Sequence, residues 1–121
     1  MRLELVTQGR RYSIWAIVRT EDPPDCPAIE FLGSLGEASR KKVANVLRLH
    51  AEEGPIKNEQ KSRFLEDGIY EFKTTAGVRL LYFFTSGQRT ILTHGFKKGS
   101  KLTMEVRRAK RLRREWMKQS C

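Results

Sequence analysis

The sequence predicts an α+β fold: an antiparallel sheet with an N-terminal strand, two helices, a three-stranded meander and a C-terminal helix. Residues 68–96 alternate between apolar and polar side chains and are divided by two glycine-containing turns, which is typical of a meander. Apolar residues recur at helical spacing before and after this segment. The 121 residues are enough for one hydrophobic core, so we expect a single domain over residues 1–121.

The N-terminal strand is expected over residues 11–18. Both of its faces are largely apolar, which is typical of a strand that is covered on both sides. Residues 21–27 contain three prolines and two aspartates, so we expect a loop there. A short helix is expected over residues 28–32 and should end near Gly33.

The second helix has a start signal and a stop signal. Ser34 and Glu37 have the spacing of a capping box, in which each side chain satisfies a free backbone N–H of the first turn. Gly54 and Pro55 are expected to end the helix, because glycine adopts the left-handed cap and proline cannot continue a helix. The apolar stripe between these signals consists of Val43, Val46, Leu47 and His50.

The meander strands are expected over residues 68–73, 78–84 and 90–96, with turns at 74–77 and 86–88. The C-terminal helix is expected over residues 103–118. Its apolar stripe consists of Leu102, Val106, Ala109, Leu112 and Trp116.

The chain is strongly basic, with a formal net charge of +10. Ten of its Lys and Arg residues lie between Lys97 and Lys118, where there are only two acidic residues. A run this uneven favours a polyanionic partner or an acidic protein, although a solvated helix face is the alternative. The residues expected to bind RNA are Lys97, Lys101, Arg107, Arg108, Lys110 and Arg111.

Other classes of protein are disfavoured. No run of 18 apolar residues offers a membrane span, and charges interrupt every apolar run near the N-terminus, so a signal peptide is not expected. The two cysteines, Cys26 and Cys121, have neither disulfide-framework nor metal-ligand spacing, so we expect a reducing cytoplasm and no metal site.

Cationic and titratable residues gather at the end of the meander. Lys73, Arg79, His94, Lys97 and Lys98 are expected within reach of one sheet surface. Charged groups held on rigid strands suit a site that binds, and could cleave, a phosphate backbone.

Three motifs in the meander carry a resemblance to a known family. They are Glu71-Phe72-Lys73, Val78-Arg79-Leu80-Leu81-Tyr82 and His94-Gly95-Phe96-Lys97-Lys98. In this order and at these separations, they resemble the RelE superfamily of toxins, in particular its phage-derived HigB-like branch. The resemblance extends from about Tyr12 to Trp116. Lys73 stands where this branch commonly has Arg, and Val78 stands where it has an aromatic residue.

The resemblance implies a RelE-like fold and the toxin of a type II toxin–antitoxin pair. Such toxins are metal-independent endoribonucleases that need no cofactor and usually cut mRNA on the ribosome, by attack of the 2′-hydroxyl on the adjacent phosphate. The partner is typically a small helix-turn-helix antitoxin. The expected catalytic residues are Lys73, Arg79, His94 and Lys98.

Each catalytic residue has an expected role and an alternative. Arg79 would hold the phosphate, but its alternation with apolar residues also suits a half-buried structural arginine. Lys98 would be a second clamp or the acid, and surface charge is its alternative. His94 could be acid or base, or a hydrogen-bonded core histidine. Lys73 could accept a proton only if burial and nearby cations favoured its neutral form, and it could instead pair across the sheet.

Three functions therefore stay open at the level of sequence. The first is the ribonuclease toxin. The second is a non-catalytic module that binds RNA or the ribosome. The third is a degenerate toxin that mainly binds its antitoxin.

Overall fold

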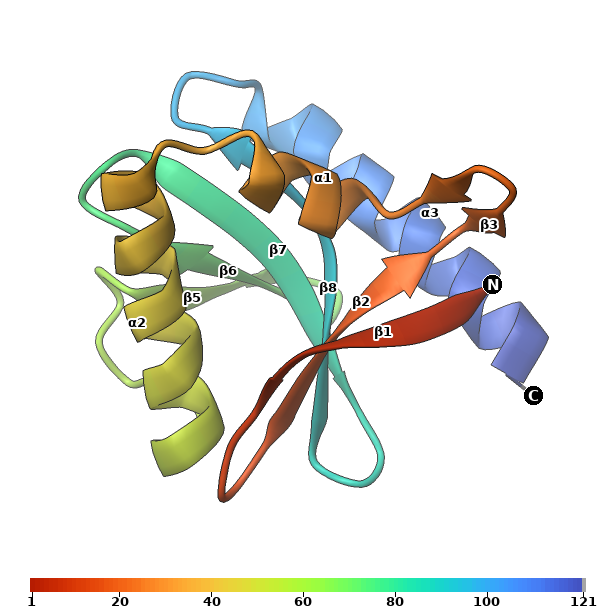
Figure 1. Cartoon of the computed structure of the whole chain (residues 1–121), viewed down its shortest axis with the longest axis horizontal. Coiled ribbons are helices and arrows are strands. Elements are labelled where there is room, and N and C mark those ends of the chain that lie inside the picture. The colour runs from red at the N-terminus through yellow and green to blue at the C-terminus, as the bar shows by residue number, and fades with distance from the viewer. Residues whose placement is uncertain (121) are drawn as a thin grey trace.

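A six-stranded sheet forms the centre of the computed structural model of this chain, which describes residues 1–120 (Figure 1). The strand order is β1-β2-β8-β7-β6-β5. All neighbouring strands are antiparallel except β2 and β8, which are parallel. The strands are β1 (Arg2–Gln8), β2 (Ser13–Val18), β5 (Ser62–Glu66), β6 (Ile69–Lys73), β7 (Val78–Thr85) and β8 (Arg89–Lys97).

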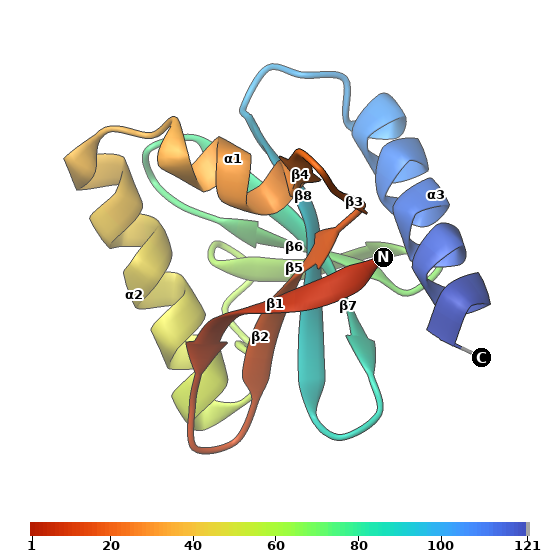
Figure 2. The same cartoon turned by 45° about the vertical axis from the view of Figure 1, so that its right-hand side comes forward.

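Helices cover both faces of the sheet. The helices are α1 (Pro27–Gly33), α2 (Glu37–Glu53) and α3 (Leu102–Ser120). Figures 1 and 2 show α1 and α2 on one side of the sheet and α3 on the other. Two separate hydrophobic cores result, one under α1 and α2 and the other under α3. Strand β2 contributes to both, because Ile14 and Ile17 lie on its opposite faces.

The predicted α+β fold is confirmed, with its N-terminal strand, two helices, meander and C-terminal helix. The second helix buries Val43, Val46, Leu47 and His50, as its periodicity predicts. The α3 stripe buries four of its five predicted members, and Leu102 at its start is more exposed. Gly54 has a φ of 92° and its N–H donates to the His50 carbonyl, which confirms the stop signal.

The sheet differs from the prediction in three ways. It is mixed rather than antiparallel, because β2 pairs in parallel with β8. Edge strands β1 and β5 were not predicted, and most of their side chains are exposed. A two-stranded hairpin of β3 (Thr20–Glu21) and β4 (Pro24–Asp25) occupies part of the expected loop.

The predicted capping box at Ser34 and Glu37 is wrong. The residue before α2 is Gly36, and no side chain caps this end. The Ser34 hydroxyl instead donates to the Phe31 carbonyl (2.6 Å) at the end of α1. The two helices follow so closely that Ser34 caps the end of the first rather than the start of the second.

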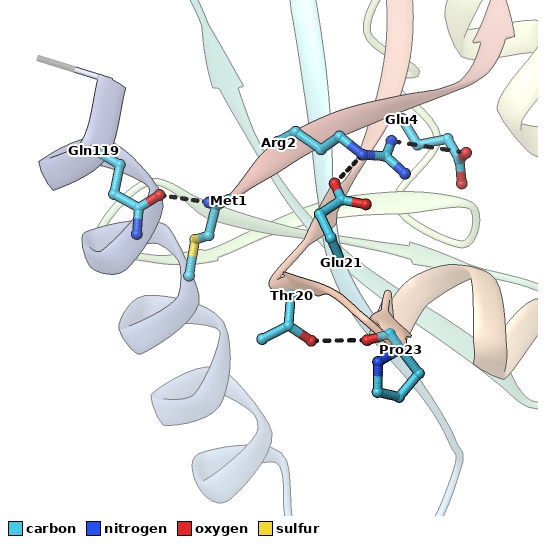
Figure 3. Close-up of polar contacts among 7 residues, drawn as sticks. All are labelled: Met1, Arg2, Glu4, Thr20, Glu21, Pro23 and Gln119. Carbon is cyan, nitrogen blue, oxygen red and sulfur yellow. Dashed lines mark hydrogen bonds and ion pairs between the residues drawn. The ribbon is translucent and has the colours of Figure 1, made fainter.

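The N-terminus is tied to the far end of the chain. The Met1 amino group donates to the Gln119 side chain on α3 (2.7 Å), as Figure 3 shows. Arg2 forms an ion pair with Glu21 of the small hairpin, and Thr20 donates to the Pro23 carbonyl (3.1 Å). None of the helices within residues 1–120 is long and apolar enough to cross a bilayer.

Candidate functional site

Three of the predicted catalytic residues meet at one end of the sheet, where β6 ends, β7 begins and β8 ends. Lys73 lies opposite Arg79 in the β6–β7 ladder, and Arg79 lies opposite Phe96 of β8. The Lys98 N–H donates to the Gly77 carbonyl (2.7 Å), so Lys98 lies beside the turn that precedes Arg79. Strand register therefore brings Lys73, Arg79 and Lys98 to one edge of the molecule.

Arg79 is half-buried and turned toward the adjacent turn. Its Nη1 donates to the carbonyls of Thr74 (3.3 Å) and Val78 (3.2 Å). Among the described residues, no carboxylate forms an ion pair with Arg79. The backbone bonds orient the guanidinium while leaving its charge available to an anion.

Lys73 does not form the ion pair across the sheet that is the alternative to its catalytic role. Glu71, two residues earlier on the same strand, has a buried carboxylate. This carboxylate accepts a hydrogen bond from Arg63 Nε (2.9 Å). The Lys73 side chain is half-buried and makes no ion pair within residues 1–119. Its charge therefore stays available beside that of Arg79.

Lys97 and Lys98 are both exposed, but they differ in direction. Lys97 lies opposite Val78, whose side chain belongs to the core under α1 and α2. Lys97, the last residue of β8, is therefore directed to that face, whereas Lys98 follows the strand and lies beside Gly77, in the turn that precedes Arg79. Of the two, Lys98 is better placed to act together with Arg79.

His94 is separated from these residues by burial. Its ring is 1% exposed, with Nε2 3.0 Å from Glu105 Oε1 and Nδ1 3.1 Å from Thr93 Oγ1. Burial lowers the pKa of His94, although the Glu105 carboxylate acts in the opposite direction. This is the hydrogen-bonded core histidine of the alternative reading, and it connects β8 to the first turn of α3.

A bulge explains why simple alternation misplaces His94. Leu81 lies opposite His94 and Tyr82 lies opposite Leu92, so Thr93 is the extra residue. Leu92 consequently belongs to the core under α1 and α2, while His94 faces α3. Regular alternation would place Leu92 and His94 on one face of β8, and the bulge places them on opposite faces.

Exposed cations form one line along the outer side of α3. Arg107, Arg111, Arg114 and Lys118 recur at spacings of four, three and four residues, and all four side chains are exposed. None of them forms an ion pair with a described residue. We call these four residues the α3 cationic stripe. Lys101, also predicted to bind RNA, is exposed just before the helix.

Two of the predicted RNA-binding residues on α3 lie outside the stripe. Lys110 pairs with Glu66 (2.6 Å) and Asp67 (2.7 Å) in the β5–β6 turn region, and this contact lowers the pKa of Asp67. Arg108 is half-buried near His94. The charge of Lys110 is therefore already compensated within the fold.

The sequence did not point to Lys42 of α2 as part of this edge. Its Nζ donates to Thr75 Oγ1 in the β6–β7 turn (3.0 Å), across 33 positions of the chain. Beside this bond a polar pocket lies between α2 and the turn, and Lys73 forms part of its wall. Within residues 1–120, no group of three or more His, Cys, Asp or Glu side chains could hold a metal ion.

Comparisons with known proteins relate the chain to one family. Residues 30–114 match the model of the family described as "Phage derived protein Gp49-like (DUF891)". No curated protein matches the sequence. Among solved structures, the chain is similar to the isolated E. coli RelE toxin, with 20% identity and a TM-score of 0.48 over 67% of this chain and 88% of that chain.

Proposed function

Because the chain belongs to the phage-derived Gp49-like family, one of the RelE-like toxin families, we propose that it is the toxin of a type II toxin–antitoxin pair. In this proposal it is a metal-independent endoribonuclease that cleaves mRNA on the ribosome, in the cytoplasm. One observation carries the catalytic part: Lys73, Arg79 and Lys98 lie beside one another at one end of the sheet. Three cations without a competing carboxylate suit a phosphodiester that gains negative charge in the transition state.

The reaction needs a base, an acid and charge stabilisation. The RNA 2′-oxygen bonds to the adjacent phosphorus as its proton leaves, and the bond from phosphorus to the 5′-oxygen breaks as that oxygen gains a proton. The products are a cyclic phosphate and a 5′-hydroxyl. Only the RNA is consumed, because the proton taken from the 2′-hydroxyl balances the proton delivered to the 5′-oxygen.

Residue types assign the roles. Arg79 keeps its charge at any physiological pH and can donate in pairs, so it would hold the non-bridging phosphate oxygens. Lys98 would supply a second positive charge and the proton for the leaving oxygen. Lys73 would accept the 2′-hydroxyl proton when neutral, a role that lysine can take and arginine cannot.

His94 has a positioning role in this proposal. Its ring reaches no solvent and bonds to Glu105, so it fixes the last part of β8 against α3. Lys97 and Lys98 follow directly at the end of that strand. Direct participation of His94 would first require the start of α3 to move away from the sheet.

The basic helix and the partner complete the proposal. The α3 cationic stripe and Lys101 would contact the RNA or ribosomal phosphates beyond the cleavage site. A helix-turn-helix antitoxin would neutralise the toxin, and the net charge of +10 suits an acidic partner surface.

Separate Arg79→Ala and Lys98→Ala variants test the proposal. We expect each to lose growth arrest on induced expression and to lower RNA cleavage by roughly 100- to 1,000-fold, the usual cost of removing one transition-state donor. Arg48→Ala, an exposed arginine on α2, is the matched control and should stay toxic. Circular dichroism would verify that each variant is folded.

Two outcomes would decide against the nuclease. Wild-type protein that binds RNA in a graded, salt-dependent way and releases no new 5′-hydroxyl ends would be a non-catalytic binding module. Cells that grow normally while producing the wild-type chain without any antitoxin would indicate a degenerate toxin.

A further inference from the structure

Apart from Lys73, the residues that line the polar pocket between α2 and the β6–β7 turn have no role in the reaction described above. Its walls come from α2, from the loop before β5 and from residues 73–75. Figure 1 shows the first turns of α2 beside the β6–β7 turn, and the Lys42–Thr75 hydrogen bond joins them. Three segments that are distant in the sequence thus enclose one pocket.

Eight of the nine residues that line this pocket are polar, and its charged side chains are all cationic. Three lysines, Lys42, Lys61 and Lys73, are among the residues that line the pocket, and no carboxylate lines it. Asn45, Asn58 and Gln60 add three primary amides. Cations attract phosphate, while an amide can donate and accept at the edge of a base, so this combination suits a nucleotide.

The amides have free hydrogen-bonding capacity. Asn58 Oδ1 accepts from the Gln60 N–H (2.9 Å), which fixes the Asn58 side chain and leaves its NH₂ group unused. The side-chain amides of Asn45 and Gln60 make no hydrogen bond with another described side chain or backbone group. Unused donors and acceptors in a hollow can read the identity of a base.

The size of the pocket limits its occupant. Its volume is about 240 Å³. Sites for drug-sized ligands usually span roughly 300–1,000 Å³. A single base with a neighbouring phosphate at the rim fits this volume better than a longer segment of RNA.

The pocket shares a wall with the proposed cleavage site. Lys73 lies opposite Arg79 in the ladder and also lines the pocket. The Arg79 guanidinium donates to the Thr74 carbonyl (3.3 Å), and Thr74 is the next residue of the wall. The Arg79 side chain leaves the sheet on the α3 face, whereas the pocket lies on the α2 face. RNA held at Arg79 would therefore pass around the end of the sheet at Thr74 to place an adjacent nucleotide at the pocket.

We infer that this pocket is a base-recognition subsite, which receives the base of a nucleotide next to the scissile phosphate of single-stranded RNA. Asn45 and Asn58 contact the edge of the base, and Lys42 and Lys61 contact the flanking phosphate. The inference rests on the proposed ribonuclease function, and it assigns sequence preference to residues outside the catalytic set.

Conservative variants test the subsite. Asn58→Asp keeps the oxygen that accepts from Gln60 but replaces the NH₂ donor with an acceptor. Asn45→Ala removes the second amide. A good amide–base pair discriminates against the wrong base by roughly five- to 150-fold. We expect each variant to lose a large part of the preference for the base beside the cut. The measurement is sequencing of the ends released from a random-sequence RNA pool.

Two lysines of the same loop provide a matched pair. Lys61 lines the pocket, whereas Lys57 lines a different hollow, beside Phe64 and Tyr70. We expect Lys61→Ala to weaken binding of short single-stranded RNAs of every base composition by a similar factor. Lys57→Ala should leave both affinity and base preference as in the wild type.

The outcomes separate failure of the subsite from failure of the proposed function. If the wild type cleaves RNA and both amide variants keep its base preference, the subsite is refuted and the nuclease stands. If the wild type cleaves nothing, the nuclease fails. In that case, the affinity of the full chain for short RNAs of each base decides whether the subsite exists. Base-selective binding lost in Asn45→Ala supports the subsite, and unselective or absent binding refutes it.

Discussion

The α3 cationic stripe should determine the salt dependence of RNA binding. On single strands, the slope of log K against log salt concentration is about −0.7 for each phosphate contacted, because each contact releases condensed counterions. If the four residues of the stripe contact phosphates, they contribute a slope of about −2.8. Raising salt from about 50 to about 200 mM would then lower their contribution to affinity by about 50-fold.

Two adjacent residues on α3 allow a comparison between a cation without an ion pair and a cation that is already paired with carboxylates. Arg111 is exposed and forms no ion pair with a described residue, whereas Lys110 lies 2.6 Å from Glu66 and 2.7 Å from Asp67. Arg111→Gln should make the slope less steep by about 0.7, since one phosphate contact is lost. Lys110→Gln removes the same formal charge but should leave the slope unchanged.

Fluorescence anisotropy with a short single-stranded RNA, titrated at several salt concentrations, measures both slopes. An Arg79→Ala background slows cleavage during the titration. Equal loss of slope in the two variants would refute the reasoning, because a lysine neutralised by two carboxylates would then contribute as much as a free arginine. An unchanged slope in Arg111→Gln would show that the stripe does not contact RNA.

Two further predictions concern stability. Burial lowers the pKa of His50 to about 4 from its ordinary value of 6.5, so unfolding takes up a proton between these pH values. The free energy of unfolding should therefore fall by about 3 kcal/mol as pH decreases through this window, and urea titrations of His50→Gln should show less of this loss. Gly95→Ala should destabilise by about 1–3 kcal/mol or more, since its Cβ would lie 2.2 Å from the Phe31 ring. In Gly33→Ala the added Cβ would meet no neighbouring group within 4 Å, so this variant should retain the wild-type melting temperature.

Much of the fold could be predicted because its buried elements have regular periodicity. The stripe of α2 is visible in the sequence because one face of this helix must be apolar. Strands β6 and β7 are visible as short runs rich in apolar residues because both of their faces are covered. Edge strands β1 and β5 have no such requirement, and their exposed, charged residues hide the pattern. The bulge at Thr93 and the parallel pairing of β2 with β8 depend on tertiary contacts that no local signal encodes.

The site was predictable where it depends on strand register alone. Lys73 and Arg79 flank one tight turn, so their proximity follows from a hairpin. His94 required knowledge of the bulge and of α3, and its bond to Glu105 could not be inferred from alternation. The compensation of Lys110 by Asp67 likewise joins segments with no sequence signal between them.

The parallel pairing of β2 with β8 also affects how the chain can be assembled. Residues 13–16 can pair with residues 89–92 only after those residues have been synthesised. A growing polypeptide must therefore carry the β1–β2 hairpin with the backbone hydrogen-bonding groups on one side of β2 unpaired until synthesis is almost finished. Premature termination anywhere before β8 would leave the first hairpin and the remaining strands without their shared neighbour. Such fragments would lack the end of β8 that brings Lys98 beside Gly77.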